Sequence, residues 1–322
     1  MLKKIFGSKL LRLAFSLILI YFAFKKVDVL KLLEELKRVP LWFVLTNVFL
    51  SFFIVALISF RWSLLLFPKF KIKTVFTFTR ASFLAAFYSL FFPTAIAGDV
   101  LKWAAIDHKY PEIPKSKVLG SVIFDRFVGL SVFVFMGLIS AIIGRRNGMI
   151  IPDYIFYLLL VSTIVCFLIY LAIYFFDMSK LLPKVKFLHR LDDAFELLKD
   201  KNKGQIVKCI LMSAISETFW ILQMWFVSWK FGANIGILAV FVFVPIISTI
   251  LILPISIGGF GAREQLYLFF FSQIGSSNES ILLMSTFLGI LGVINSLFGG
   301  LLSLLDQETR GKVKRTLVVD RL

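Results

Sequence analysis

Residues 118–143 read VLGSVIFDRFVGLSVFVFMGLISAII, an apolar run interrupted only by the charged pair Asp125-Arg126. At about 1.5 Å per residue, a helix of this length can cross the hydrocarbon core of a bilayer, which is about 30 Å thick. Strands of membrane barrels instead alternate apolar and polar residues over about ten positions. The run therefore predicts a membrane-spanning α-helix.

The rest of the composition agrees with this interpretation. The 322 residues are 59% hydrophobic and only 17% charged, with 38 Phe and a mean hydropathy of +0.90. Soluble domains average about 45–50% apolar residues. These values exclude a soluble enzyme, a disordered chain and a disulfide scaffold. They predict an all-α polytopic membrane helix bundle.

Eight apolar runs are long enough to cross a bilayer, and we expect them to form one transmembrane domain over residues 1–322. Two amphipathic connections, Asp28–Arg38 and Asp177–Gly204, have apolar residues at helical spacing and are predicted to be surface helices. The first run has no small-residue cleavage site after it, so we expect it to be retained. The eight predicted spans are Ile5–Phe24, Leu41–Phe60, Thr74–Phe92, Val118–Ile143, Tyr154–Phe176, Ile206–Trp229, Ile235–Leu253 and Ile281–Leu305.

The formal net charge of +17 comes mainly from Lys and Arg between the apolar runs. In that position they meet anionic lipid head groups, so membrane lipids are the expected partners and nucleic acid is not. The basic residues divide almost evenly between the two faces, so the positive-inside rule does not decide the orientation. We expect a multi-pass protein of the cell (inner) membrane with both termini in the cytoplasm.

Two similar interruptions suggest an internal repeat. PTAIAGDVLK (93–102) and PISIGGFGAR (254–263) both read Pro-x-x-Ile-small-Gly, with a basic residue nine positions after the proline. They are half the chain length apart, which suggests repeat halves 1–150 and 151–322. The apolar stretches that follow, Val100–Ile106 and Gln265–Phe271, are too short to cross and are predicted to be re-entrant helices. Four spans separate the motifs, so we expect both to face the same side.

The second motif has the residues of a phosphate site. Gly258, Gly259 and Gly261 allow positive φ and a close backbone approach. The helix beginning near Ala262 would present its N–H groups to an anion. The two charged residues at its start, Arg263 and Glu264, could bind a phosphate and cap the helix dipole. A tight loop between two spans, with both charges merely interfacial, is the alternative.

The first motif repeats this arrangement more weakly, with Gly98, Asp99 and Lys102. Asp99 could instead be a plain helix cap.

Charged residues inside spans are costly and often functional. Asp125 and Arg126 lie about 100° apart on one helix, so each needs its own partner. Glu217 lies in the middle of another span, and we expect it to meet Arg126. These groups either form a polar cavity for a charged head group or hold the helices together as ion pairs. We expect Asp99, Lys102, Arg126, Arg263 and Glu264 to line one pocket.

Arg61 and Trp62, at the end of the second predicted span, are interpreted as an interfacial anchor and an aromatic belt residue.

His108 and His189 have no second ligand nearby, so we expect no metal and no cofactor.

These motifs resemble the signature stretches of the flippase-like transmembrane family. That family includes the N-terminal membrane module of lysylphosphatidylglycerol synthases and archaeal proteins of lipid-linked glycan pathways. The resemblance covers nearly the whole chain and implies that a charged lipid or polyprenyl-phosphate-linked sugar moves between leaflets. Lys102 stands where the family usually has Arg, which keeps the charge but loses the bidentate fork. No aminoacyl-transferase domain follows the membrane region, so we expect no synthesis of lysyl-lipid. The expected substrate-contacting residues are Pro93, Gly98, Asp99, Lys102, Asp125, Arg126, Glu217, Pro254, Gly258, Gly259, Gly261, Arg263 and Glu264.

Three classes of function remain open. The leading hypothesis is a lipid flippase or scramblase without enzymatic activity, and no nucleotide-binding motif is present. An integral membrane enzyme acting on lipid phosphates is the alternative. A small-solute or ion transporter is the third class, and an accessory protein of a lipid or glycan assembly complex is the remaining alternative.

Overall fold

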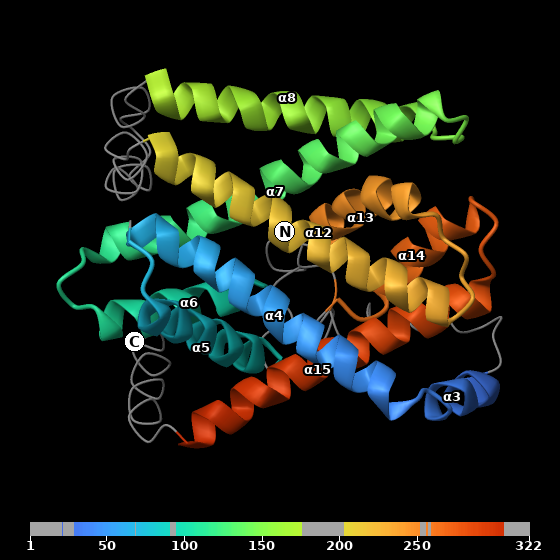
Figure 1. Cartoon of the computed structure of the whole chain (residues 1–322), viewed down its shortest axis with the longest axis horizontal. Helices are drawn as coiled ribbons and strands as arrows, with labels where there is room; N and C mark the ends of the chain where they lie inside the picture. Colours follow the sequence, from blue (N-terminus) through green and yellow to red (C-terminus); the bar gives the residue numbers. More distant parts are fainter. Residues whose placement is uncertain are drawn as a thin grey trace, which may run out of the picture.

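The computed structural model describes residues 21, 29–67, 69–90, 95–175, 203–251, 256 and 259–305. Within these residues every regular element is a helix, which confirms the all-α fold (Figure 1). The helices are α3 (Val29–Lys37), α4 (Leu41–Leu66), α5 (Ile72–Ser89), α6 (Ala95–Lys109), α7 (Lys115–Arg146), α8 (Asp153–Phe175), α12 (Lys203–Lys230), α13 (Ile237–Leu251), α14 (Ala262–Ser272) and α15 (Asn278–Leu305).

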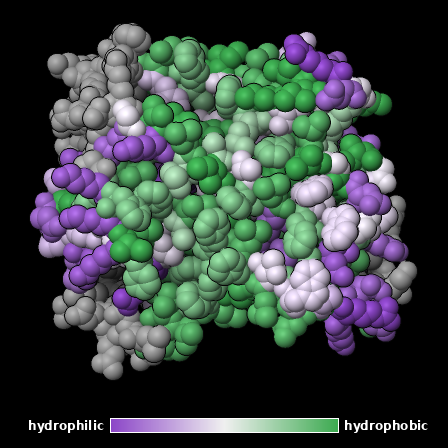
Figure 2. Space-filling view, viewed as in Figure 1, coloured by the Kyte–Doolittle hydropathy of each residue, from purple (hydrophilic) through white to green (hydrophobic). Residues whose placement is uncertain are grey.

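Five of these helices are long and apolar enough to cross a membrane: α4, α7, α8, α12 and α15. Figure 2 shows the expected surface, a hydrophobic band across the middle with hydrophilic residues gathered at both ends of the long axis. The protein is therefore a polytopic integral membrane protein. The predicted span Ile5–Phe24 and most of the predicted surface helix Asp177–Gly204 lie outside the described residues. The other predicted surface helix is present as α3.

Two of the predicted spans, Thr74–Phe92 and Ile235–Leu253, are arms of hairpins instead. The first forms α5, which packs along α6, and the second forms α13, which contacts α14. Since α13 has 15 residues, its length at about 1.5 Å per residue is well short of a bilayer core of about 30 Å. The two predicted re-entrant helices are α6 and α14, both longer than the short apolar stretches suggested.

The two hairpins open toward opposite ends of the bundle, which corrects the expectation that both motifs face the same side. The link between α4 and α5 and the link between α6 and α7 lie at the end where Gln205 of α12 bonds the Leu64 carbonyl. At the other end, Ser276 donates a 2.6 Å hydrogen bond to the Ala233 carbonyl, which joins the links on either side of the second hairpin. Figure 1 shows α5 and α6 reaching inward from one side and α13 and α14 from the other. The parity argument failed because neither α5 nor α13 crosses the bundle.

Helix packing between the two parts of the chain is reciprocal. α5 packs mainly on α15, α13 packs on α7, and α4 packs on α12. Each hairpin thus rests on the long helix that closes the other half, and α4 and α12, the helices that precede the two hairpins, pair with each other. The division into repeat halves stays a prediction, and hairpins that enter from opposite ends correspond to the inverted-repeat form that many transporters have.

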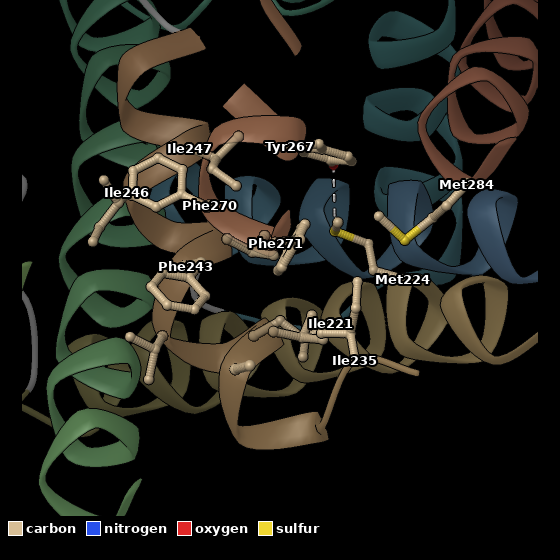
Figure 3. Packing of buried hydrophobic residues seen from close by; sticks show 14 of the residues in the cluster. Ile221, Met224, Ile235, Phe243, Ile246, Ile247, Tyr267, Phe270, Phe271 and Met284 are labelled. Atoms are coloured by element: carbon tan, nitrogen blue, oxygen red, sulfur yellow. Dashed lines mark hydrogen bonds between the residues drawn. The ribbon is translucent and has the colours of Figure 1, made fainter. Parts of the chain in front are cut away.

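Apolar packing fixes the second hairpin in place (Figure 3). Phe243 of α13 lies against Phe271 of α14, and Ile221 of α12 lies in the same cluster. The hydroxyl of Tyr267 is 3.6 Å from the sulfur of Met224. Because these side chains are buried among aromatic and aliphatic neighbours, α14 is held rigidly inside the bundle.

A glycine contact fixes the first hairpin. Gly299 of α15 lies directly against the Phe83 carbonyl of α5, where a Cβ atom would collide with the backbone. Gly300 packs in the same way under the ring of Phe87. Small residues at such positions let membrane helices approach closely.

Candidate functional site

Arg61 is buried at the centre of the bundle and is not an interfacial anchor. Its helix continues through Ser63 to Leu66, so the guanidinium lies inside the bundle with 4% of the side chain exposed. Trp62 is buried as well, and its indole N–H donates to the Ser121 hydroxyl at 3.0 Å. Both interfacial interpretations from the sequence are therefore wrong. The cause is that α4 extends beyond the predicted span.

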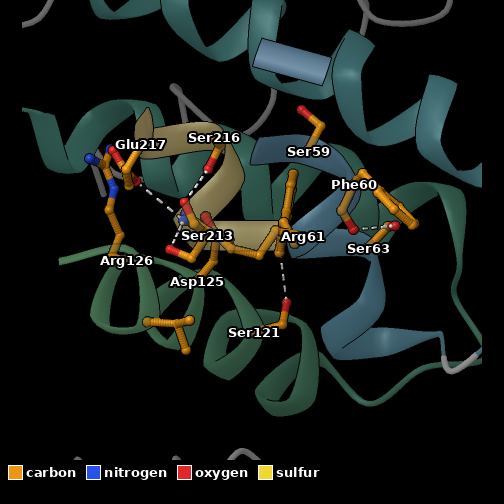
Figure 4. Close-up of polar contacts among 12 residues, drawn as sticks. Ser59, Phe60, Arg61, Ser63, Ser121, Asp125, Arg126, Ser213, Ser216 and Glu217 are labelled. Carbon is orange, nitrogen blue, oxygen red and sulfur yellow. Dashed lines mark hydrogen bonds and ion pairs between the residues drawn. The ribbon is translucent and has the colours of Figure 1, made fainter. Parts of the chain in front are cut away.

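The guanidinium of Arg61 joins three helices (Figure 4). Its Nε donates to Asp125 of α7 at 2.7 Å. Its Nη1 donates to the Ser213 hydroxyl at 2.9 Å and to Glu217 at 3.4 Å, both on α12. Both carboxylates are buried. A charge in this position requires a partner, and here one cation serves two anions.

Gly129 makes the room for this guanidinium. A Cβ atom at Gly129 would lie 2.9 Å from Nη1 and 3.2 Å from Cζ of Arg61. Gly129 lies four residues after Asp125, so both residues present the same face of α7 to Arg61. The Asp125…Gly129 spacing therefore has a structural reason: one residue binds the guanidinium and the other makes space for it.

Asp125 and Arg126 take separate partners, as their angular separation requires. Arg126 points toward α6, where its Nε and Nη2 both donate to one oxygen of Asp99, at 3.1 and 2.9 Å. The expectation that Glu217 pairs with Arg126 is wrong, because Arg61 is the ion-pair partner of Glu217. Sequence reasoning had placed Arg61 at the membrane surface and so did not consider it.

The pair of Asp99 and Arg126 is accessible. Their side chains are 25% and 50% exposed, although both helices belong to the interior of the fold. Lys102, one turn after Asp99, lies with its Nζ 5.5 Å from the centre of the Trp62 ring. Its charge also acts on Arg126, Asp125, Asp99 and Arg61. Two cations and one carboxylate thus lie close together, and two of the three, Arg126 and Asp99, are accessible.

The start of α14 is different, because its own carboxylate occupies the anion position. Glu264 accepts a 2.6 Å hydrogen bond from the Gly261 N–H, and Gly261 has φ 80°. The other carboxylate oxygen accepts from Arg263 at 2.6 Å and from Ser285 at 3.2 Å. A Cβ at Gly289 would collide with the Arg263 guanidinium. Arg263 is thus held by Glu264, Ser285 and the space left by Gly289, and its charge is neutralised by Glu264.

The predicted residues therefore lie in two clusters. Asp99, Lys102 and Arg126 lie together beside the Arg61 cluster, and Arg263 and Glu264 lie together against α15. Between the described side chains, no hydrogen bond or ion pair joins one set to the other, and the expectation that all five residues line one pocket stays a prediction. Pro93, Pro254 and Gly258 lie outside the described residues.

The glycines of the two motifs have different surroundings. Gly98 packs against Ser89 of α5, so it serves the close contact within the first hairpin. Gly259 has φ 78° with open space where a Cβ would be. Its backbone conformation, and not crowding, explains the choice of glycine there.

Sequence reasoning missed Arg61, Ser213, Ser285 and Gly289. The apolar run Ser63–Leu66 after Trp62 was a signal that α4 continues and that Arg61 is internal. Nothing in the local sequence distinguishes Ser213, Ser285 or Gly289 from ordinary small residues of a membrane helix. Among the described residues, no group of three or more His, Cys, Asp or Glu could hold a metal ion.

Comparison with known families gives one match, and it covers most of the chain. Residues 9–299 match the family model described as the lysylphosphatidylglycerol synthase TM region. No curated protein and no solved structure matches the chain. The matched range includes both hairpins, the Arg61 cluster and the Asp99–Arg126 pair. The chain therefore belongs to the family of lysylphosphatidylglycerol synthase transmembrane regions.

Proposed function

We propose that this protein moves a lipid with a phosphate-containing head group from one membrane leaflet to the other. The carrying observation is the accessible pair of Asp99 and Arg126 together with Lys102, which lies one turn after Asp99 on α6. Its two cations and one carboxylate give a net positive charge, which favours an anionic ligand. Membership of a family named for a lipid synthase membrane region supports a lipid as that ligand.

The chemistry of the group suits a phosphate. The bonds to Asp99 use two of the five N–H donors of the Arg126 guanidinium. Arg can bind phosphate through two parallel hydrogen bonds, and Lys adds a point charge. The first turn of α6 contains no acidic residue, so the positive end of its dipole is not neutralised by the helix itself. α14 has Glu264 in that position and is less suited to hold an anion.

The arrangement of hairpins also fits transport. Helices that break within the membrane are tolerated where protein or a water-filled cavity surrounds them. Many transporters place their substrate between inverted halves at such breaks. We further propose that the protein lies in the cell (inner) membrane with both ends on the cytoplasmic side. Replacing two predicted spans by hairpins keeps the number of crossings even and leaves that proposal unchanged.

A reconstituted transport assay tests this function. Purified protein in phosphatidylcholine vesicles is given fluorescent phosphatidylglycerol or polyprenyl phosphate, and the outer leaflet is bleached chemically. We expect the parent protein to move labelled lipid from the inner leaflet to the outer leaflet, where it is bleached. Losing one charge-assisted bond of about 1.5–3 kcal/mol should slow Arg126→Gln by about tenfold or more.

The matched control is Arg145→Gln at the other end of α7. Arg145 is also paired with an aspartate, Asp153, at 2.6 Å, but lies outside the proposed site. We expect this variant to keep the parental rate. The proposal fails if the parent moves neither lipid or if both variants behave alike. Release of a water-soluble head group would instead indicate an enzyme acting on lipid phosphates.

A further inference from the structure

Six charged side chains form one connected set inside the bundle, which we call the inner charge cluster. Arg61 pairs with Asp125 and Glu217, and Arg126 pairs with Asp99. Lys102 lies between the two parts, because it follows Asp99 by one turn of α6 and its Nζ is 5.5 Å from the ring of Trp62, the neighbour of Arg61. The members of the cluster are Arg61, Asp99, Lys102, Asp125, Arg126 and Glu217.

The inner charge cluster has no net charge only when no ligand is bound. Its three cations match its three carboxylates when all six groups are ionised. A bound phosphate diester or similar head group adds one negative charge next to Lys102 and Arg126. An unbalanced charge surrounded by apolar helices is expensive, so binding favours the gain of one positive charge by the cluster. A proton on a carboxylate is the simplest way to supply it.

Glu217 is the carboxylate held least tightly. Its ion pair with Arg61 is 3.4 Å long, whereas Asp125 is 2.7 Å from the same guanidinium. Asp99 accepts two hydrogen bonds from Arg126, the shorter at 2.9 Å. Ser213 takes part of the donor capacity of Nη1, at 2.9 Å. Protonating Glu217 therefore breaks the weakest of the three ion pairs and leaves Arg61 bonded to Asp125.

The charged groups around Glu217 come from two helices. α12 packs against α4, α7, α13 and α15. Arg61 of α4 is paired with Glu217, and Asp125 of α7 is paired with the same guanidinium. The described residues of α13 include no charged side chain, and α15 carries only Glu279, in its first turn. A phosphate bound at Lys102 and Arg126 would thus affect the charge of Glu217 through the neighbouring residues Asp125 and Arg61.

We propose that one proton travels on Glu217 with each phosphate charge, so that the protein is a proton-coupled lipid transporter. This inference rests on the proposed function and names the energy source of lipid movement, which is the proton gradient. The proton comes from water on the side where the head group enters, binds a carboxylate oxygen of Glu217, and returns to water on the other side. No covalent bond to the lipid forms or breaks. The loaded and empty states then carry the same charge, so the movement is electrically neutral.

Vesicles with an imposed pH difference test the proposal. The parent is reconstituted in phosphatidylcholine with fluorescent phosphatidylglycerol, and valinomycin with equal potassium on both sides holds the membrane potential at zero. We expect the labelled lipid to accumulate in the leaflet facing the alkaline side. A trapped pH dye should record proton movement in the same direction as the lipid. Imposing a potential without a pH difference should leave the distribution unchanged.

Three variants assign the effect to Glu217. Glu217→Gln fixes the group as neutral, so we expect any remaining lipid movement to be insensitive to the pH difference. Glu279→Gln makes the same chemical change on an exposed residue outside the cluster and should keep the response. Glu217→Asp, which restores a titratable group, should recover part of it. Size-exclusion profiles show whether each variant is folded.

The outcomes separate this inference from the function on which it rests. If the parent moves no lipid, the proposed function fails and the inference fails with it. If the parent moves lipid equally with and without a pH difference, the function stands and proton coupling is overturned. If the Glu217→Gln variant does not fold, the pH response and the proton signal of the parent protein decide whether lipid movement is coupled to protons. A Glu217→Gln variant with a full pH response overturns the assignment to Glu217.

Discussion

The Arg61 cluster and the Asp99–Arg126 pair use the same chemical groups in opposite surroundings. Arg61 is 4% exposed and binds residues from two other helices, whereas Arg126 is half exposed and binds one. Asp125 and Arg126 are neighbours in the chain, yet Asp125 binds Arg61 of α4 and Arg126 binds Asp99 of α6. A rotation of about 100° between consecutive residues separates a structural charge from an accessible one.

This difference assigns each arginine a separate task. A buried ion pair is weak evidence for stability in itself, but removing one partner leaves the other charge uncompensated. An exposed pair contributes little to folding, and its groups remain available to a ligand. We therefore expect Arg61 to matter for the bundle and Arg126 to matter for the substrate.

The largest expected effect is that of Arg61→Met. Two buried carboxylates lose their cation, so the free energy of unfolding should fall by about 3–5 kcal/mol. Arg126→Met should lower it by no more than about 1 kcal/mol. Thermal unfolding in detergent, followed by size exclusion, measures both. Equal destabilisation by the two substitutions would contradict the distinction drawn between the two arginines.

Gly129→Ala tests the space under the guanidinium. The new Cβ would lie 2.9 Å from Nη1 of Arg61, which three partners hold in place. We expect a loss of about 1–3 kcal/mol from overpacking. Gly292→Ala on α15 has open space around its Cβ and should gain up to about 1 kcal/mol from helix propensity. If the first substitution is neutral, Arg61 is not held as described.

Glu264→Gln extends the comparison to the second hairpin. The variant weakens the bond to the Gly261 N–H and leaves Arg263 without its countercharge. A lost cap is worth about 0.5–2 kcal/mol, so we expect a moderate fall in the thermal midpoint. Gln265→Glu places a carboxylate one position later, outside the cap, and should not restore stability in the double variant. An unchanged midpoint for Glu264→Gln would show that the carboxylate does not hold the start of α14.

Asp99→Asn should have the smallest effect on folding, within about 1 kcal/mol. It removes the competitor for Arg126 and leaves the accessible group with a net charge higher by one. We therefore expect tighter binding of anionic lipid, detected as more lipid retained in native mass spectra. Asp153→Asn, which releases Arg145 at the far end of α7, is the control and should retain no more lipid than the parent. Equal retention by Asp99→Asn and the parent would place the phosphate elsewhere.

The sequence was sufficient for the class of fold and for several elements. Uninterrupted apolar runs have only one stable solution in a bilayer, because each backbone polar group must be bonded within its own helix. Five of the predicted spans, the two re-entrant helices and the helix at Val29–Lys37 follow from this rule. Asp125, Arg126 and Glu217 were also identified as charges inside spans, because a charge in an apolar run requires a partner.

Only the tertiary structure decided which charges meet and which helices cross. Thr74–Phe92 and Ile235–Leu253 are apolar enough to be predicted as spans, yet α5 and α13 turn back because each packs on the closing helix of the other half. Arg61 looked interfacial until α4 was seen to continue to Leu66 and to bring it against Asp125 and Glu217. Ion-pair partners 64 and 156 residues apart are chosen by helix packing, which local sequence patterns do not encode.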